Sequence, residues 1–193
     1  MRIISGKFKG RRFSPPADNW PTRPTTDYAK EGLFNLLNNR IYFEDQRVLD
    51  LFGGTGTTDY EWISRGCCDV TYVDRHGPAV AFVKQTVATL GVEECIQIFR
   101  MDVFKFIERP VAQPYTYIFA GPPYPLPNIP ELPDLVFNAG LIAPGGLFVL
   151  EHNPHHDFSG DPRCTEVRSY GKTIFSFFQT EAPESDTESG SGQ

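Results

Sequence analysis

The sequence predicts an α/β fold with a seven-stranded, mostly parallel sheet, helices on both faces and a C-terminal antiparallel hairpin. Three observations support this prediction. From residue 47 to residue 151, short apolar runs of strand type alternate with helical stripes, a pattern typical of parallel sheets with crossover helices. Near the end, Gly171 alone separates two strand-like runs, which predicts a tight hairpin. A basic, glycine-containing segment precedes the sheet and predicts an N-terminal hairpin and helix.

The first forty residues form the N-terminal extension. Ile3-Ile4 and residues 8–13 flank Ser5-Gly6-Lys7, an arrangement that predicts a β-hairpin. Residues 14–24 are rich in proline and predict a loop. Thr25-Thr26-Asp27 supplies capping oxygens for a helix, whose apolar stripe fades near Asn38.

The remaining elements follow in chain order. The expected strands are 47–52, 70–74, 96–99, 115–120, 146–151, 165–170 and 172–179, and the expected helices are 57–65, 78–90 and 132–139. We expect three parts: the extension at 1–40, a cofactor-binding domain at 41–180, and a disordered acidic tail at 181–193.

Charge is distributed unevenly along the chain. The 193 residues carry a formal net charge of −6, yet residues 1–40 hold eight basic and three acidic side chains. The basic side chains of the first twelve residues are Arg2, Lys7, Lys9, Arg11 and Arg12. Such a segment on an acidic body fits either a localised phosphate contact or a solubilising edge hairpin. The chain has no apolar run long enough to cross a bilayer and no signal-peptide pattern at its start, so we expect a soluble cytoplasmic protein.

The four cysteines show neither metal-ligand nor disulfide spacing. Cys67 and Cys68 are adjacent, and Cys95 and Cys164 are isolated. We therefore expect free thiols with small apolar side chains, in keeping with a reducing compartment.

A glycine turn follows the first predicted strand of the sheet. The run Asp50-Leu51-Phe52-Gly53-Gly54-Thr55-Gly56 lacks the third glycine of the dinucleotide fingerprint. Its aspartate can hold an ammonium group, and its glycines let a ligand approach the backbone at a helix N-terminus. This combination favours S-adenosylmethionine over NAD. The alternative is a tight strand–helix connection that binds no ligand, which would have a similar sequence.

Acidic residues also follow the next two strands. Asp74 can accept from both ribose hydroxyls, and Asp102 can accept from the adenine amino group. Either acid alone would more often be a helix cap or a solvated loop residue, but three acids at successive strand ends indicate a site. The expected cofactor-binding set is Asp50, Phe52, Gly53, Gly54, Thr55, Gly56, Asp74, Arg75, Asp102 and Val103.

The fourth sheet strand ends at Gly121-Pro122-Pro123-Tyr124. Proline fixes this turn, so the Pro122 carbonyl can accept from a substrate amino group. Tyr124 offers a ring on which a flipped base can stack. A proline-rich turn without function is the alternative, and the strand-end position favours the catalytic interpretation.

These segments together resemble the RsmD family of bacterial 16S rRNA guanine-N2 methyltransferases. The resemblance runs from Met1 to about Thr180, and RIISGKFKGRR, TRPTTDYAKEGLFNLL, VLDLFGGTGTTDYEWISRG, PPY and LIAPGGLFVLEH carry it. It implies a Rossmann-like class I methyltransferase fold and methyl transfer from S-adenosylmethionine to N2 of a guanine in the small ribosomal subunit. It also implies that the basic hairpin and Arg23 contact RNA, and a monomer is favoured.

Gly121 departs from the family pattern, which places Asp or Asn before Pro-Pro-Tyr. Loss of one positioned acceptor typically lowers a rate by ~10²–10³, so we expect a weakened or inactive enzyme that still binds cofactor. Asp59, where small residues are usual, could crowd the methionine end, and Gly32 should weaken its helix. The alternatives are a cofactor- and rRNA-binding protein without turnover, and an amino-methyltransferase acting on DNA or protein.

The run Glu151-His152-Asn153-Pro154-His155-His156 is rich in potential metal ligands. Pro154 breaks any helical register that would align two imidazoles, so we predict a polar strand-end loop and no metal site.

Overall fold

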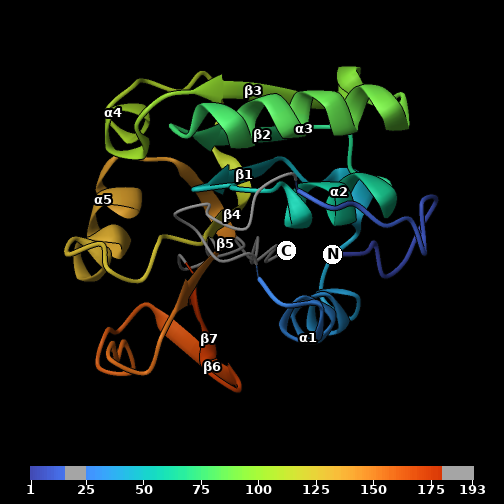
Figure 1. The fold of residues 1–193 in the computed structure, drawn as a ribbon. Coiled ribbons are helices and arrows are strands. Elements are labelled where there is room, and N and C mark those ends of the chain that lie inside the picture. The colour runs from blue at the N-terminus through green and yellow to red at the C-terminus, as the bar shows by residue number, and fades with distance from the viewer. Residues whose placement is uncertain (16–24, 180–193) are drawn as a thin grey trace, which may run out of the picture.

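The computed structural model describes residues 1–15 and 25–179, and its centre is one seven-stranded sheet (Figure 1). The strands are β1 (Val48–Leu51), β2 (Val70–Asp74), β3 (Ile96–Arg100), β4 (Tyr115–Ala120), β5 (Ile142–His152), β6 (Cys164–Tyr170) and β7 (Thr173–Gln179). Their order is β3-β2-β1-β4-β5-β7-β6, with β7 antiparallel to both β5 and β6. The predicted mostly parallel sheet with a C-terminal hairpin is confirmed.

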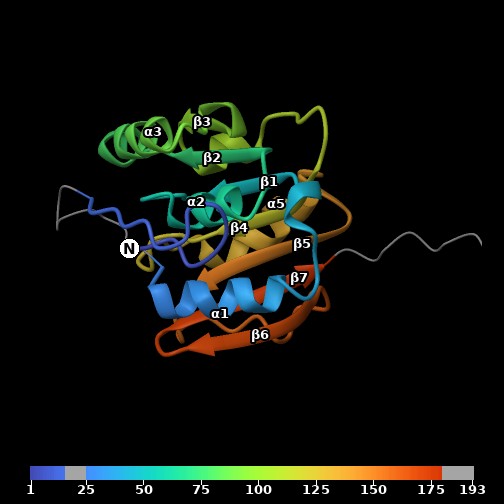
Figure 2. The same ribbon diagram turned by 90° about the vertical axis from the view of Figure 1, so that its right-hand side faces the viewer.

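Helices cover both faces of this sheet, as the two ribbon views show (Figure 1, Figure 2). The helices are α1 (Asp27–Leu37), α2 (Thr57–Ser64), α3 (Gly77–Leu90), α4 (Val103–Ile107) and α5 (Leu132–Asn138). Buried side chains of α1, α2 and α3 join one core cluster, and those of α4 and α5 join the other. The two clusters lie on opposite faces of the sheet, because Val48 of β1 belongs to the first cluster and its neighbour Leu49 belongs to the second.

The predicted N-terminal β-hairpin is wrong in detail. The segment folds back on itself, but within residues 1–15 its only ladder contact is an isolated antiparallel bridge between Arg2 and Arg12. The amide of Ile3 still donates to the Arg11 carbonyl at 2.9 Å. The amides of Ile4 and Ser5 instead donate to the Glu61 carboxylate on α2, at 2.8 and 3.0 Å, which removes them from any ladder.

Helix α1 begins as the sequence predicts and packs more tightly than expected. Thr26 is its N-cap, accepting from the amide of Ala29 at 3.2 Å. A Cβ added to Gly32 would lie 2.1 Å from the ring of Tyr170 on β6. The glycine therefore permits the close approach of the Tyr170 ring to α1, and this contact offsets its low helix propensity.

The expectation of free thiols is wrong for two cysteines. Cys68 and Cys95 form a disulfide with a Cα–Cα distance of 4.1 Å. They lie just before β2 and β3, whose register pairs Val70 with Ile96, so the parallel pairing brings them together across 27 residues of sequence. Cys67 and Cys164 are free. The thiol argument for a reducing compartment therefore fails.

Most predicted bounds agree with the structure within one or two residues, with two exceptions. Strand β5 begins at Ile142 rather than at 146, and the short helix α4 was not predicted. No helix in residues 1–15 and 25–179 has the length and apolar character needed to span a membrane. The expected boundary at residue 40 stays a prediction, and the tail at 181–193 lies outside the described residues.

Candidate functional site

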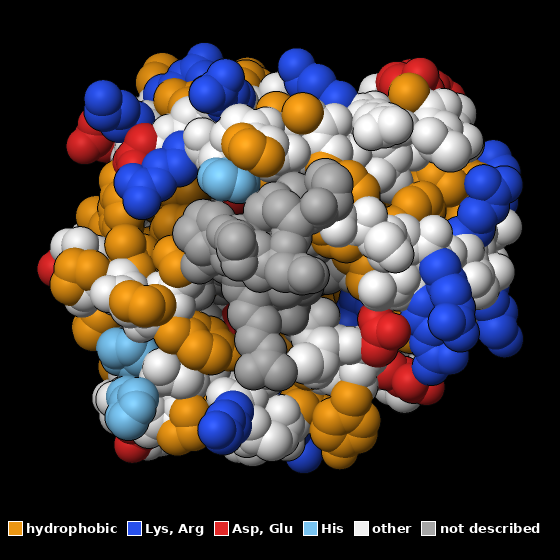
Figure 3. All heavy atoms as spheres, in the orientation of Figure 1, with side chains coloured by type: hydrophobic (Ala, Val, Ile, Leu, Met, Phe, Trp, Pro, Cys, Tyr) orange, Lys and Arg blue, Asp and Glu red, His pale blue; other side chains and the backbone are white. Residues whose placement is uncertain are grey.

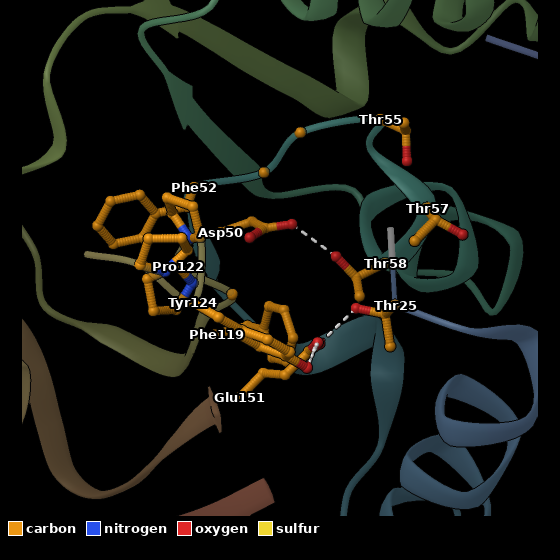
Figure 4. Close-up of a pocket in the computed structure, with 15 residues that line it drawn as sticks. Thr25, Asp50, Phe52, Thr55, Thr57, Thr58, Phe119, Pro122, Tyr124 and Glu151 are labelled. Atoms are coloured by element: carbon orange, nitrogen blue, oxygen red, sulfur yellow. Dashed lines mark hydrogen bonds between the residues drawn. The ribbon is translucent and has the colours of Figure 1, made fainter. Parts of the chain in front are cut away.

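Two hollows lie at the carboxyl ends of the parallel strands, where open α/β sheets bind ligands. The first, of about 160 Å³, is drawn in Figure 4, and the second, of about 430 Å³, adjoins it. Phe52 and Pro123 line both, so the hollows are neighbours on either side of these two side chains. Their volumes are of the size found for small-molecule sites, about 300–1,000 Å³ in all.

The glycine turn after β1 lines the first hollow, and its Phe52 also lines the second. The amide of Gly54 donates to Asp74 Oδ2 at 2.9 Å, and the Tyr72 hydroxyl donates to the Gly54 carbonyl at 2.8 Å. A Cβ on Gly53 would lie 2.4 Å from the ring of Tyr72, so only glycine fits there. Phe52 has φ of +65°, a left-handed conformation that costs a non-glycine residue on the order of 1–3 kcal/mol. Such strain is typical of functional turns.

Asp50 lies at the end of β1 in the first hollow, almost fully buried. Its Oδ2 accepts from the Thr58 hydroxyl at 2.5 Å, while its buried Oδ1 accepts from no N–H or hydroxyl group of the described residues. Burial raises the pKa of Asp50 to about 7. A buried carboxylate oxygen without an N–H or hydroxyl donor, bordering a hollow, fits an incoming ammonium group.

Asp59, on the first turn of α2, is fully buried against Asp50. Its carboxylate oxygens accept from no N–H or hydroxyl group of the described residues, and its carboxyl shares a side-chain hydrogen bond with Asp50 that lowers the pKa of Asp50. Burial, followed by the Asp50 charge, raises its pKa well above the usual range. Asp59 does not line the hollow, so it does not occupy the cofactor space directly and instead acts on Asp50.

The second hollow collects the remaining acids predicted from the sequence. It is lined by Phe52, Asp74, Arg75, His76, Gly77, Asp102, Val103, Phe104, Pro123 and Leu126. Asp102 is the N-cap of α4, accepting from the amide of Phe104 at 3.0 Å, and lies 3.7 Å from the Arg75 guanidinium. Asp74 accepts from the His76 amide at 2.7 Å. Both acids thus also stabilise local structure, and their expected contacts to ribose and adenine stay predictions.

The Gly121-Pro122-Pro123-Tyr124 turn forms the other wall of the first hollow. Opposite it lies Glu151, buried at the end of β5. Its Oε2 accepts from the Thr25 hydroxyl at 2.5 Å and its Oε1 from the Tyr124 hydroxyl at 3.2 Å, as Figure 4 shows. Sequence reasoning missed Thr25 and Glu151 as site residues. The signal for Glu151 was its place at a strand end, which also identified the three aspartates.

The basic side chains of the N-terminal segment are exposed. Figure 3 shows lysine and arginine side chains gathered along the edge where Figure 1 places the N-terminal segment. Arg2, Lys7, Lys9, Arg11 and Arg12 are all exposed, and Arg23 lies outside the described residues.

A buried lysine ties the segment to the hollow. Lys30 Nζ donates to the Arg2 carbonyl at 2.6 Å and to the Thr57 hydroxyl at 3.0 Å, and it lies 3.5 Å from Glu61 Oε2. Thr57 in turn lines the first hollow.

The histidine-rich run after β5 is held by other contacts. The imidazole of His152 bonds to the Ser176 hydroxyl at 2.8 Å and to the Asn153 carbonyl at 2.9 Å. Among the described residues, no group of three His, Cys, Asp or Glu side chains is placed to hold a metal ion.

The sheet order, the glycine turn and the strand-end hollows together define a Rossmann-like class I methyltransferase fold. Residues 1–179 match the model of the family described as "Conserved hypothetical protein 95". The chain belongs to that family, which is the RsmD family.

Named relatives agree with this assignment. The chain is 34% identical over 178 residues to "Putative rRNA methyltransferase YlbH" of Bacillus subtilis, covering 90% of this chain and 95% of the relative. It is 27% identical to "Ribosomal RNA small subunit methyltransferase D" of Escherichia coli K12, covering 97% and 94%. A solved structure of a hypothetical protein of Thermus thermophilus superposes with a TM-score of 0.80 at 28% identity, covering 93% and 99%. The predicted family and fold are confirmed.

Proposed function

We propose that this protein transfers a methyl group from S-adenosylmethionine to the exocyclic N2 of a guanine in 16S rRNA of the small ribosomal subunit. The observation that carries the proposal is the pair of adjoining hollows at the strand ends. The first is lined by Asp50, whose Oδ1 is a buried acceptor, and the second is lined by Asp102. Membership of the RsmD family and relatives named as rRNA methyltransferases support the coarser activity. The guanine-N2 target is the finer part of the proposal.

The hydrogen-bond acceptors in the two hollows fit S-adenosylmethionine. Asp50 Oδ1 would accept from the cofactor's ammonium group, because it is a buried acceptor that lacks an N–H or hydroxyl donor among the described residues. Asp74 and Asp102 would accept from the ribose hydroxyls and the adenine amino group, and Val103 and Phe104 offer apolar surface to the base. When bound, the cofactor supplies an electrophilic methyl group on a sulfonium.

The Pro-Pro-Tyr turn would hold the target base. The Pro122 carbonyl accepts from the amino group, and the Tyr124 ring stacks on the extruded guanine. An aromatic amino nitrogen is a weak nucleophile, so orientation of the base within the hollow supplies much of the acceleration.

The exposed basic segment would contact the rRNA backbone. Each phosphate neutralised by a lysine or arginine adds to the salt dependence of binding. Replacing Lys7, Lys9 and Arg11 by glutamine should therefore weaken rRNA binding and lower the slope of log K against log salt by about 3. A slope equal to that of the wild type would favour the alternative, a merely solubilising segment. We place the protein in the cytoplasm, where its proposed substrate is found, with no membrane or metal partner, and we favour a monomer.

One observation favours a second candidate, a protein that binds cofactor and rRNA without turnover. Gly121 has no side chain to accept from the target amino group, and loss of such an acceptor lowers rates by about 10²–10³. The test is transfer of a labelled methyl group to unmethylated small subunits under single-turnover conditions. Transfer to rRNA supports the enzyme, cofactor binding without transfer supports the second candidate, and transfer only to DNA or protein would refute both.

A further inference from the structure

Glu151 and Gly121 lie side by side at the edge of the sheet. Strands β4 and β5 pair in parallel with Ala120 opposite Leu150, so the next residue of each strand is Gly121 and Glu151. Both line the first hollow, and Figure 4 shows the Glu151 side chain directed toward Tyr124 and Thr25.

The absent side chain at residue 121 leaves room beside the Glu151 carboxylate. A Cβ built on Gly121 would lie 3.9 Å from Glu151 Oε2 and 3.2 Å from the Phe119 ring. An aspartate at 121 would place a second carboxylate next to Glu151 in a buried setting, where like charges repel strongly. With glycine there, a substrate group can reach the space that Glu151 borders.

The Glu151 carboxylate is fixed in place and retains acceptor capacity. It is 5% exposed, and hydroxyls of Thr25 and Tyr124 donate to its two oxygens. An ionised carboxylate offers about four lone-pair positions, so two hydrogen bonds leave room for a donor from the substrate. Burial raises its pKa, which makes it a better proton acceptor than an exposed glutamate.

We propose that Glu151 is a catalytic residue that replaces the acceptor missing at Gly121, its carboxylate accepting a hydrogen bond from the target amino group. This inference rests on the proposed function. As the nitrogen lone pair bonds to the methyl carbon, the electron pair of the carbon–sulfur bond returns to sulfur. The nitrogen then carries an excess proton, which passes to a Glu151 oxygen and from there to water.

The first test compares Glu151→Gln with the wild type in single turnover, using labelled S-adenosylmethionine and unmethylated small subunits. We expect the rate to fall about 10²–10³-fold, while cofactor binding by calorimetry and the melting temperature stay close to those of the wild type. Glu93→Gln, an exposed glutamate remote in sequence from the site, is the matched control and should leave the rate unchanged. A Glu151→Gln rate within about threefold of the wild type would overturn the proposal.

A second readout separates catalysis from a purely structural role. The wild-type rate should fall on the acid side as the Glu151 carboxylate, whose pKa is raised, becomes protonated. With S-adenosylmethionine saturating, so that its ammonium group holds Asp50 ionised, Glu151→Gln should lack this acid limb, because an amide does not titrate. Adding Gly121→Asn to Glu151→Gln should restore part of the rate by returning an acceptor to the other strand. An acid limb that persists in Glu151→Gln would refute the assignment.

These outcomes distinguish the inference from the proposed function. If the wild type transfers label to rRNA and Glu151→Gln transfers it at a similar rate, the proposed function stands and only the inference fails. If the wild type is inactive and Gly121→Asn is active, Glu151 does not compensate for Gly121, and the second candidate, binding without turnover, is supported instead of both. If the cofactor binds but the wild type and Gly121→Asn both transfer no label to rRNA, the proposed function fails, and the inference fails with it.

Discussion

The fully buried carboxyl of Asp59 should lower the stability of the folded protein at neutral pH. Its two oxygens accept from no N–H or hydroxyl group of the described residues, and it lies against Asp50, itself 2% exposed. Burial raises the pKa of Asp50 from 3.8 to about 7. At 1.36 kcal/mol per pKa unit, ionising Asp50 in the folded state at high pH costs on the order of 4 kcal/mol.

The sign of the pH dependence follows from these raised values. Between the unfolded pKa of 3.8 and the folded pKa of about 7, the native state binds more protons than the unfolded chain. The Asp50 contribution to the free energy of unfolding should therefore fall as pH rises through this window and level off above it. The penalty is absent below the unfolded pKa.

Asp59→Asn should remove the cost of the buried Asp59 carboxyl itself, whose pKa burial raises well above the usual range. The asparagine amide keeps the shape of the side chain, carries no charge and can donate to Asp50 Oδ1. We expect a gain of about 1–3 kcal/mol in the free energy of unfolding at pH 8, shrinking toward pH 5. Urea denaturation at both pH values measures the gain, with Glu93→Gln as the exposed control. A variant no more stable than the wild type at pH 8, or a gain independent of pH, would refute this reasoning.

Three further predictions concern packing and cross-links. Gly32→Ala should destabilise the protein by about 1–3 kcal/mol despite the better helix propensity of alanine, because the added methyl meets the Tyr170 ring. Thermal denaturation measures the change in stability, and the double variant Gly32→Ala/Tyr170→Leu should recover the lost stability. Lys30→Met should cost about 1–3 kcal/mol, because it leaves the Arg2 carbonyl and the Thr57 hydroxyl without their donor and removes one of two cations at Glu61, which Arg65 still contacts at 2.9 Å; equal urea midpoints would contradict this. Reduction of the disulfide should raise the thiols counted in denatured protein from two to four and lower stability by about 3 kcal/mol, whereas four thiols before reduction would contradict the pairing.

The sheet and the glycine turn could be predicted because their signals are local. Alternating strands and helices fix which residues fall at strand ends, and parallel strands bring those ends to one edge. This is why Asp50, Asp74 and Asp102 were found from sequence alone and why the structure brings Asp50 into one hollow and the other two into the next.

The features that were missed depend on contacts between distant segments. Cys68 finds its partner only through the register of β2 and β3, and Gly32 matters only because of a ring on β6. Lys30 looks like a solvated helical lysine but is buried by the N-terminal segment. Helix α4 spans five residues, too few for a helical period to show in the sequence. In each case the residues next to the feature in the sequence carry no pattern that would predict it.

The N-terminal hairpin shows how tertiary contacts override a local pattern. Ile3-Ile4 and residues 8–13 have the composition of strands, yet α2 binds the backbone between them. The amide of Lys7 donates to the Ser64 carbonyl at 2.7 Å, and that of Phe8 to the Ser64 hydroxyl at 2.9 Å. A Cβ on Gly6 would lie 1.8 Å from the same carbonyl, so the glycine permits the close approach.

The most direct test of the proposed activity identifies the methylated nucleoside. Unmethylated small subunits are incubated with the wild-type protein and labelled S-adenosylmethionine, and the 16S rRNA is then digested and analysed by mass spectrometry. We predict N2-methylguanosine at a single position. Label on another base, at another atom of guanine, or absent from rRNA while the cofactor binds would contradict the account.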